Sequence, residues 1–207
     1  MGYHSAMQHD PSFYRHLIGA LWLAWALFWL IGAFNTKVTQ RRESPGSRLA
    51  YVLPLIVAGV LLGWPHLPWG PLLAMRLWLR SFALYWTGVA LLAAGLLFAV
   101  WARVHLGRNW SGTVTVKEGH ELIRTGPYAL TRHPIYSGLL LAVIGTAITS
   151  GTVRAWIGVV IIAIAFAVKA RTEERFMRET FPGEYERYCE EVPALVPFTK
   201  LRRSAPR

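Results

Sequence analysis

The sequence predicts an all-α integral membrane protein with about five transmembrane helices, a cytosolic loop and C-terminal cytosolic helices. Three observations support this fold class. Only 16% of the 207 residues are charged and 54% are hydrophobic, whereas soluble domains carry about 25% charged residues. Uncharged runs recur along the chain, and four of them reach the roughly 20 residues that a helix needs to cross a bilayer. Ten tryptophans are present, and Trp64 and Trp69 flank a proline-rich turn where an interfacial aromatic belt would lie.

The uncharged runs place the helices in chain order. We expect transmembrane helices at about 15–35, 49–65, 80–102, 135–150 and 154–170. The last is marginal because its uncharged run is shorter than the others, so Lys169 would extend to the interface. Pro54 lies inside the second helix, where a membrane helix tolerates it if neighbours satisfy the freed carbonyl. The first run is too long for a cleaved signal peptide. A soluble helical protein is the alternative, and the tryptophans argue against it.

The net charge of +11 is concentrated in alternate connecting segments. Lys and Arg gather in 36–48, in 103–133 and in the tail from 169 onward. The positive-inside rule places these segments in the cytoplasm, with the N-terminus outside and the C-terminus cytosolic. We therefore expect a multi-pass protein of a prokaryotic inner membrane. The basic residues meet anionic membrane lipid, so no nucleic-acid partner is expected, and the single cysteine excludes a disulfide-built scaffold.

The cytosolic segment 103–134 carries the first group of polar candidates. Thr113 to Val116 has β propensity, but it is too short and isolated for us to expect a sheet. His133 and Pro134 open the fourth helix, and a helix start offers unpaired N–H groups that suit a carboxylate or a ribose oxygen. Taken singly, His133 could merely cap the helix, Tyr128 and Tyr136 could be interfacial tyrosines, and Arg132 is expected to contact lipid phosphate.

The second polar segment follows the fifth helix. Lys169 and Glu173 are four residues apart and share a helix face, so they could form a solvated ion pair or serve a site. Glu173 and Glu174 point about 100° apart, and we expect Glu173 to face inward and Glu174 to matter less. A short amphipathic helix at 184–191 and an apolar stretch ending near 198 complete the segment.

These residues together resemble the isoprenylcysteine carboxyl methyltransferase family. The resemblance rests on GHELIRTGPYALTRHPIYSG at 119–138, EERFMRETFPGEYERY at 173–188 and VPALVPF at 192–198. It covers roughly 103–198, about half of the chain. It implies an integral-membrane methyltransferase that uses S-adenosyl-L-methionine, with its cofactor pocket formed by the loop, the start of the fourth helix and the C-terminal helices. The chain would then divide into transmembrane helices one to three at 1–102 and a catalytic part at 103–207.

The resemblance also implies site residues. The implied cofactor-binding residues are His120, Glu121, Leu122, Ile123, Tyr128, His133, Pro134, Ile135, Tyr136 and Glu173. Lys169 lies where the eukaryotic enzymes have a substrate-contacting arginine, and Arg171 could take that role instead. No metal site and no obligate protein partner are expected.

The implied reaction moves a methyl group to a lipophilic substrate that enters from the bilayer. A carboxylate of the isoprenylcysteine type is favoured, because an ionised carboxylate needs no general base and Glu174 is the one base candidate. A phospholipid or a small thiol is the alternative acceptor. An NADPH-dependent sterol-type reductase and a non-catalytic membrane protein are less favoured.

Overall fold

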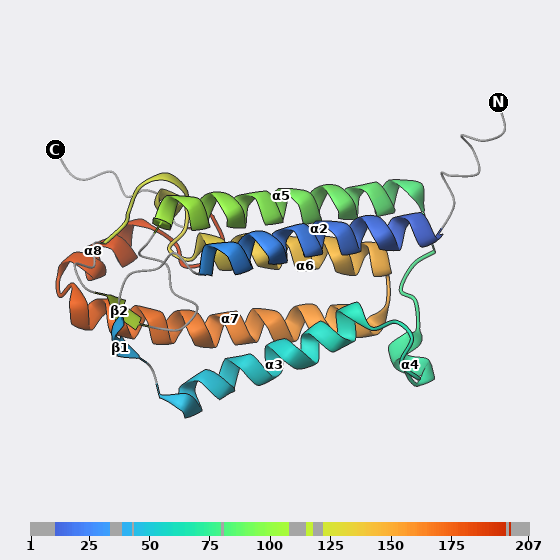
Figure 1. Cartoon of the computed structure of the whole chain (residues 1–207), viewed down its shortest axis with the longest axis horizontal. Helices are drawn as coiled ribbons and strands as arrows, with labels where there is room; N and C mark the ends of the chain where they lie inside the picture. The colour runs from blue at the N-terminus through green and yellow to red at the C-terminus, as the bar shows by residue number, and fades with distance from the viewer. Residues whose placement is uncertain are drawn as a thin grey trace.

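The computed structural model is a bundle of helices that lie side by side along one axis (Figure 1). It describes residues 11–33, 39–42, 44–79, 81–107, 115–117, 122–197 and 199. In chain order the elements are α2 (Pro11–Ala33), β1 (Thr39–Arg42), α3 (Pro45–Gly63), α4 (Pro71–Ala74), α5 (Phe82–Leu106), β2 (Thr115–Lys117), the 3-10 turn η2 (Gly126–Ala129), α6 (Pro134–Ser150), α7 (Val153–Thr180) and α8 (Glu184–Glu191).

The long helices agree with the predicted transmembrane segments. Among the described residues, α2, α3, α5 and α7 are long and apolar enough to cross a membrane, and α6 is a shorter apolar helix. The prediction of which helix is marginal was wrong. The uncharged run in α7 is short, but the helix continues into the charged residues that follow this run. Its total length is therefore 28 residues, whereas α6 has 17 residues. Helix α7 therefore extends well beyond the start of α6, and this extension carries the two glutamates.

Helices α5 and α6 pack backbone to backbone through paired glycines. A Cβ on Gly95 would lie 2.4 Å from the carbonyl oxygen of Gly138, and one on Gly145 would lie 2.4 Å from that of Gly88. Small residues allow this approach, which is typical of helix pairs in membranes. The two pairs are spaced equally along both helices, so they fix the register of α5 against α6 in an antiparallel arrangement. This register places the start of α6 beside the end of α5.

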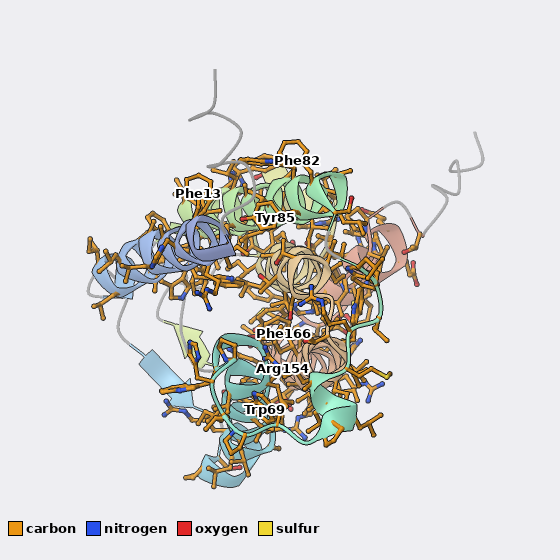
Figure 2. The ribbon with its side chains drawn as sticks, turned by 90° about the vertical axis from the view of Figure 1, so that its right-hand side faces the viewer. Phe13, Trp69, Phe82, Tyr85, Arg154 and Phe166 are labelled. Atoms are coloured by element: carbon orange, nitrogen blue, oxygen red, sulfur yellow. The ribbon has the colours of Figure 1, made fainter. Side chains whose placement is uncertain are left out.

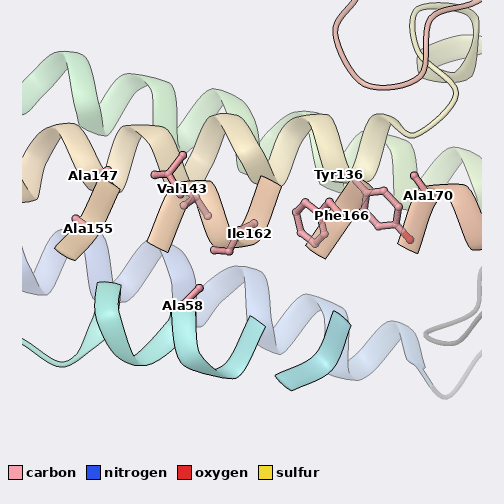
Figure 3. Close-up of a cluster of buried hydrophobic side chains, with 9 residues drawn as sticks. Ala58, Tyr136, Val143, Ala147, Ala155, Ile162, Phe166 and Ala170 are labelled. Carbon is pink, nitrogen blue, oxygen red and sulfur yellow. The ribbon is translucent and has the colours of Figure 1, made fainter. Parts of the chain in front are cut away.

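The hydrophobic core lies between α6, α7 and α3 (Figure 3). Val143 of α6 and Ile162 of α7 are buried there, and Ala58 of α3 has no exposed surface. Tyr136 and Phe166 close the core toward the end of the bundle where α8 lies, with their rings stacked at 4.8 Å. Ala170, one turn further along α7, is the small side chain of the core beyond this aromatic pair.

Helix α2 is held at two points by hydrogen bonds. Arg103 of α5 donates from Nη2 to the carbonyl of Gly32 at 2.6 Å. Trp22 donates from Nε1 to the hydroxyl of Thr146 in α6 at 3.1 Å. Yet none of the membrane-spanning window of α2 is buried inside the protein. Helix α2 is therefore attached to the bundle without being enclosed by it.

A short antiparallel pair of strands joins two connecting segments. Strand β1 pairs with β2, with Arg42 opposite Thr115 and Thr39 opposite Lys117. The prediction that Thr113 to Val116 is too isolated to form a sheet was wrong for Thr115 and Val116, because the partner strand comes from the loop after the first helix, far away in the sequence. Both strands lie near the α8 end of the bundle (Figure 1).

Candidate functional site

Five polar side chains meet where α6 begins and α7 extends past it. Arg132, His133 and Tyr136 come from the loop before α6 and its first turn, and Glu173 and Glu174 come from α7. We call these five residues the glutamate cluster. Pro134 follows His133 at the first helical position, where its fixed φ suits a helix start. The sequence brings the cluster together because the start of α6 lies beside the extended end of α7.

Glu174 is the anchor of the cluster. Its Oε1 accepts hydrogen bonds from Arg132 Nε at 3.0 Å and from Arg132 Nη2 at 2.6 Å. The same oxygen lies 3.2 Å from His133 Nε2, and Arg178 donates to Oε2 at 3.2 Å. Both carboxylate oxygens are therefore committed to cations. Two arginines keep Glu174 ionised, and together with His133 they occupy its oxygens, so the prediction that it could serve as a general base is not supported by this geometry.

Glu173 lies next to the anchor and is more open. Its Oε1 accepts a hydrogen bond of 2.5 Å from the hydroxyl of Tyr136, and its Oε2 lies 3.4 Å from His133 Nδ1. The side chain of Glu173 is 26% exposed, whereas that of Glu174 is 11% exposed. The expectation that only Glu173 faces inward was wrong. Both face the start of α6, because His133 lies between them and reaches one with each ring nitrogen.

The imidazole of His133 bridges the two carboxylates and does not cap the helix. It makes no side-chain capping hydrogen bond, although it occupies the N-cap position of α6. Burial alone would lower the pKa of His133, but the hydrogen bonds and charges of Glu173 and Glu174 raise it above its ordinary value. Its ring also stacks on that of Tyr136 at 5.5 Å. The simple capping interpretation of His133 is therefore excluded.

The C-terminal segment covers the backbone before α6. The N–H groups of Arg132 and His133 donate to the carbonyls of Pro193 and Ala194 at 2.9 and 3.0 Å. Thr131, which has no exposed surface, donates its hydroxyl to Ala194 O at 2.5 Å. The N–H groups of Arg132 and His133 are therefore already bonded within the chain. They cannot also bind a ligand carboxylate, as the sequence predicted for the helix start.

Arg132 also ties the cluster to the C-terminal segment, and sequence reasoning missed this role. Besides Glu174, it donates from Nη1 to Cys189 O at 3.2 Å and to Val192 O at 2.5 Å. The expectation that Arg132 contacts lipid phosphate was wrong, because its side chain is only 8% exposed. Its position next to His133 was visible in the sequence, but its partners lie 42 to 60 residues away.

Of the two predicted substrate-contacting residues, Lys169 lies beside the cluster. Its Nζ lies 5.5 Å from the ring centre of Tyr136 and 5.1 Å from that of Tyr51. Tyr51, a buried residue of α3, is a second residue that sequence reasoning missed. Arg171 is exposed and makes no contact with the cluster among the described residues. The structure therefore brings Lys169 to this site and does not bring Arg171 there.

The predicted adenosine-binding loop is described only in part. His120 and Glu121 lie outside the described residues, while Leu122 packs against the buried pair Tyr185 and Tyr188. Ile123 is half-buried. This part of the loop therefore lies against α8.

Tyr128 and the first turn of α6 form the wall of the site toward α5. Tyr128 is buried against His105, and its carbonyl accepts a 2.6 Å hydrogen bond from Tyr188. Pro134 is fully buried, and Ile135 packs on the core. The predicted cofactor-binding residues that the structure describes therefore lie together at one end of the bundle. Among them, Glu173 is the carboxylate that remains partly exposed.

Comparisons with known proteins find similarity in the same region. Residues 83–184 match the phospholipid methyltransferase family. The chain is 32% identical to nickel-cobalt-cadmium resistance protein NccN of Alcaligenes xylosoxydans xylosoxydans, over 58% of this chain and 55% of that protein. It is 28% identical to protein-S-isoprenylcysteine O-methyltransferase B of Arabidopsis thaliana, over 62% of this chain and 64% of that protein. The chain thus spans between half and two thirds of the length of these curated relatives.

A solved structure shares the fold. The eukaryotic intramembrane Ras methyltransferase ICMT (isoprenylcysteine carboxyl methyltransferase) matches with a TM-score of 0.51 at 21% identity, over 77% of this chain and 55% of that one. Together with the long apolar helices, this likeness confirms the predicted all-α integral membrane fold.

Proposed function

We propose that this chain, which belongs through its C-terminal part to the isoprenylcysteine carboxyl methyltransferase family, is a membrane-embedded methyltransferase. The proposed donor is S-adenosyl-L-methionine, and the proposed acceptor is a lipophilic carboxylate of the isoprenylcysteine type. The observation that carries the proposal is the partly exposed carboxylate of Glu173. His133 and Tyr136 hold this carboxylate in place, beside the wall formed by Tyr128 and the first turn of α6.

The residues present fit the proposed donor. When bound, S-adenosyl-L-methionine supplies a methyl group made electrophilic by a sulfonium centre, and it also carries an ammonium group. A carboxylate suits these positive charges, and Glu173 keeps enough exposed surface to meet one, whereas Glu174 is committed to Arg132. Leu122, Ile123 and Tyr128 offer the apolar surroundings that an adenine needs. His120 and Glu121 remain proposed contacts from the same loop.

Lys169 is the proposed contact for the acceptor. Its ammonium lies against the faces of Tyr51 and Tyr136, at the boundary between the apolar core and the cluster. A lipophilic acid entering between helices would bring its carboxylate to this cation. A bound donor would supply its methyl carbon to one oxygen of this carboxylate, and the electron pair of the broken carbon–sulfur bond would stay on sulfur. No proton moves, so orientation and exclusion of water by the residues are what the site contributes.

Phospholipid methylation is the second candidate, because residues 83–184 match the family that bears this description. An amine acceptor would have to lose a proton, and Glu174 is already occupied by cations. Transfer of a labelled methyl group to a prenylated cysteine with a free carboxylate, compared with phosphatidylethanolamine, distinguishes the two. Labelling of the phospholipid alone would replace the carboxylate acceptor by the amine.

Equilibrium binding to the purified full chain in detergent tests the donor. We expect S-adenosylhomocysteine to bind and NADPH not to bind. Glu173→Gln keeps the shape of the side chain and removes its charge, so it should weaken binding by about 1.5–3 kcal/mol, the range for a charge-assisted hydrogen bond. Glu179→Gln, at an exposed position of the same helix, is the matched control and should bind normally. Binding of NADPH alone would instead favour a reductase, and binding of neither would favour a non-catalytic protein.

A further inference from the structure

A large cavity lies in the bundle on the side of Phe166 away from the glutamate cluster. Its volume is about 960 Å³, and it is bounded by α2, α3, α6, α7, the start of α5 and the segment that leads into α5. Figure 2 views the bundle from the end where this cavity begins, with Tyr85 of α5 on one side and Arg154 of α7 on the other. Phe166, stacked on Tyr136, lies at its inner end.

The lining changes character along its length. The inner part is apolar and includes Leu139, Ile162 and Phe166. The outer part carries Arg15, Arg76 and Arg154 together with hydroxyl side chains of the α6–α7 turn, and no acidic residue lines the cavity within the described part of the chain. Arg154 is buried and already donates to Leu61 O, with its guanidinium over the ring of Trp69. Of the described residues that line the cavity, Arg15 and Arg76 are exposed cations at its mouth.

The length of the cavity corresponds to one acyl chain. Arg154 and Phe166 are twelve residues apart on α7, which is about 18 Å at 1.5 Å per residue. Half of a bilayer's hydrocarbon core is about 15 Å deep. We propose that the cavity binds an anionic phospholipid of the membrane, with one acyl chain reaching toward Phe166 and the phosphate at Arg15 and Arg76. Charge complementarity at the mouth selects this lipid over a zwitterionic one.

This lipid is distinct from the proposed methyl acceptor. Its headgroup lies at the mouth, on the far side of the Phe166–Tyr136 stack from Glu173 and Lys169. Its acyl chain fills the space between α2 and α3, where α2 has no buried residues in its membrane-spanning window. The bound lipid therefore serves to hold α2 in place, and it is not consumed.

The test measures lipid retention by native mass spectrometry of the purified full chain. Phosphatidylglycerol and phosphatidylcholine with identical acyl chains are offered at equal concentration. We expect the wild-type chain to retain phosphatidylglycerol about tenfold over phosphatidylcholine, given the attraction of two arginines for an anionic headgroup. Equal retention of the two lipids would overturn the proposal.

Two kinds of variant test binding of the lipid headgroup and binding of the acyl chain separately. The pair Arg15→Gln and Arg76→Gln should abolish the preference, whereas Arg48→Gln and Arg175→Gln, exposed residues of other regions, should preserve it. Gly59→Leu should reduce retention of both lipids, because Gly59 lines the cavity and a Cβ there meets nothing within 4 Å. An unchanged preference in the first pair, or unchanged retention in Gly59→Leu, would overturn the site. Binding of S-adenosylhomocysteine, followed in the same samples, reports on the proposed function separately.

Discussion

The contact between α5 and α6 differs sharply from the space between α2 and α3. In the first, glycines bring two backbones into direct contact, and Leu92 has no exposed surface. In the second, side chains of both helices line a cavity of about 960 Å³. Residues 83–184, which match the family, contain the closely packed pair, whereas α2 and α3 precede them. We infer that the two regions have different roles. The packed pair α5 and α6 holds the glutamate cluster rigid, and α2 and α3 determine which molecules can enter from the membrane.

The largest expected effect comes from filling the packed contact. Gly95→Leu would place a Cβ 2.4 Å from the carbonyl oxygen of Gly138, and neither backbone can move without separating α5 from α6. We expect no folded, monodisperse protein in size-exclusion chromatography. Gly59→Leu is the matched control, since the same side chain would enter open space there. If both variants fold equally well, the contrast between the two regions is wrong.

The next effect comes from breaking the buried ion pair. Arg132→Met leaves Glu174 buried without its main partner, and it frees the carbonyls of Cys189 and Val192. Loss of one partner of a buried pair costs about 3–5 kcal/mol. We expect a large drop in melting temperature, measured in detergent without ligand. Arg175→Met, at an exposed position on α7, should melt like the wild type, and a similar loss in both would refute the anchoring role of Arg132.

A smaller effect concerns the ligand rather than the fold. His133→Asn preserves a good N-cap residue but is too short to bridge Glu173 and Glu174. We expect affinity for S-adenosylhomocysteine to fall about tenfold, the scale of one charge-assisted hydrogen bond, because Glu173 loses a group that orients it. Titration calorimetry measures this loss. Wild-type affinity in this variant would remove His133 from the proposed site.

The same histidine gives stability a dependence on pH. The pKa of His133 is raised in the folded protein by the two glutamates, against the effect of burial. Its charge therefore stabilises the fold fully below the unfolded pKa of about 6.5, and this contribution is lost as the pH rises through the folded pKa. Melting temperature should fall on the alkaline side in the wild type and less so in His133→Asn. Parallel pH profiles of the two proteins would contradict this assignment.

The smallest effect lies on the loosely held side. Trp22→Phe removes the hydrogen bond to Thr146, which should cost about 0.5–1.5 kcal/mol, together with part of the packing of the Trp22 ring against Trp25. Thr146→Val removes the same bond from the other partner. The two losses should therefore not add in the double variant, which thermal melting can show. Additive losses would mean that the bond does not hold α2 to α6.

Much of the architecture could be predicted from the sequence, because uncharged runs report directly on a bilayer. Among the described residues, the four long helices and the shorter α6 overlap their predicted ranges, although α7 continues to Thr180, well past the predicted end at 170. The family resemblance rests on motifs that the structure brings together at one end. Local patterns could not reveal partners distant in sequence. Strand β2 looked isolated because β1 lies in another loop, and Arg132 looked like a surface residue because Glu174 and Val192 are far along the chain.

The two glutamates illustrate the same limit. Helical geometry correctly separates their directions, yet it cannot show that His133 would lie between them and meet both. Lys169 could be placed near the site from its spacing to Glu173, whereas Tyr51 of α3 could not, since nothing in its own segment signals a neighbour in α7.

The carbonyls of Pro193 and Ala194, bound to the backbone before α6, have a consequence for biosynthesis. During translation Thr131, just before α6, is synthesised 63 residues before its hydrogen-bond partner Ala194. Until then Arg132 and His133 lack the backbone partners that fix the start of α6, so the cluster cannot adopt its final geometry. The start of α6 is therefore fixed only after the segment that carries Pro193 and Ala194 has been synthesised and has folded back onto it.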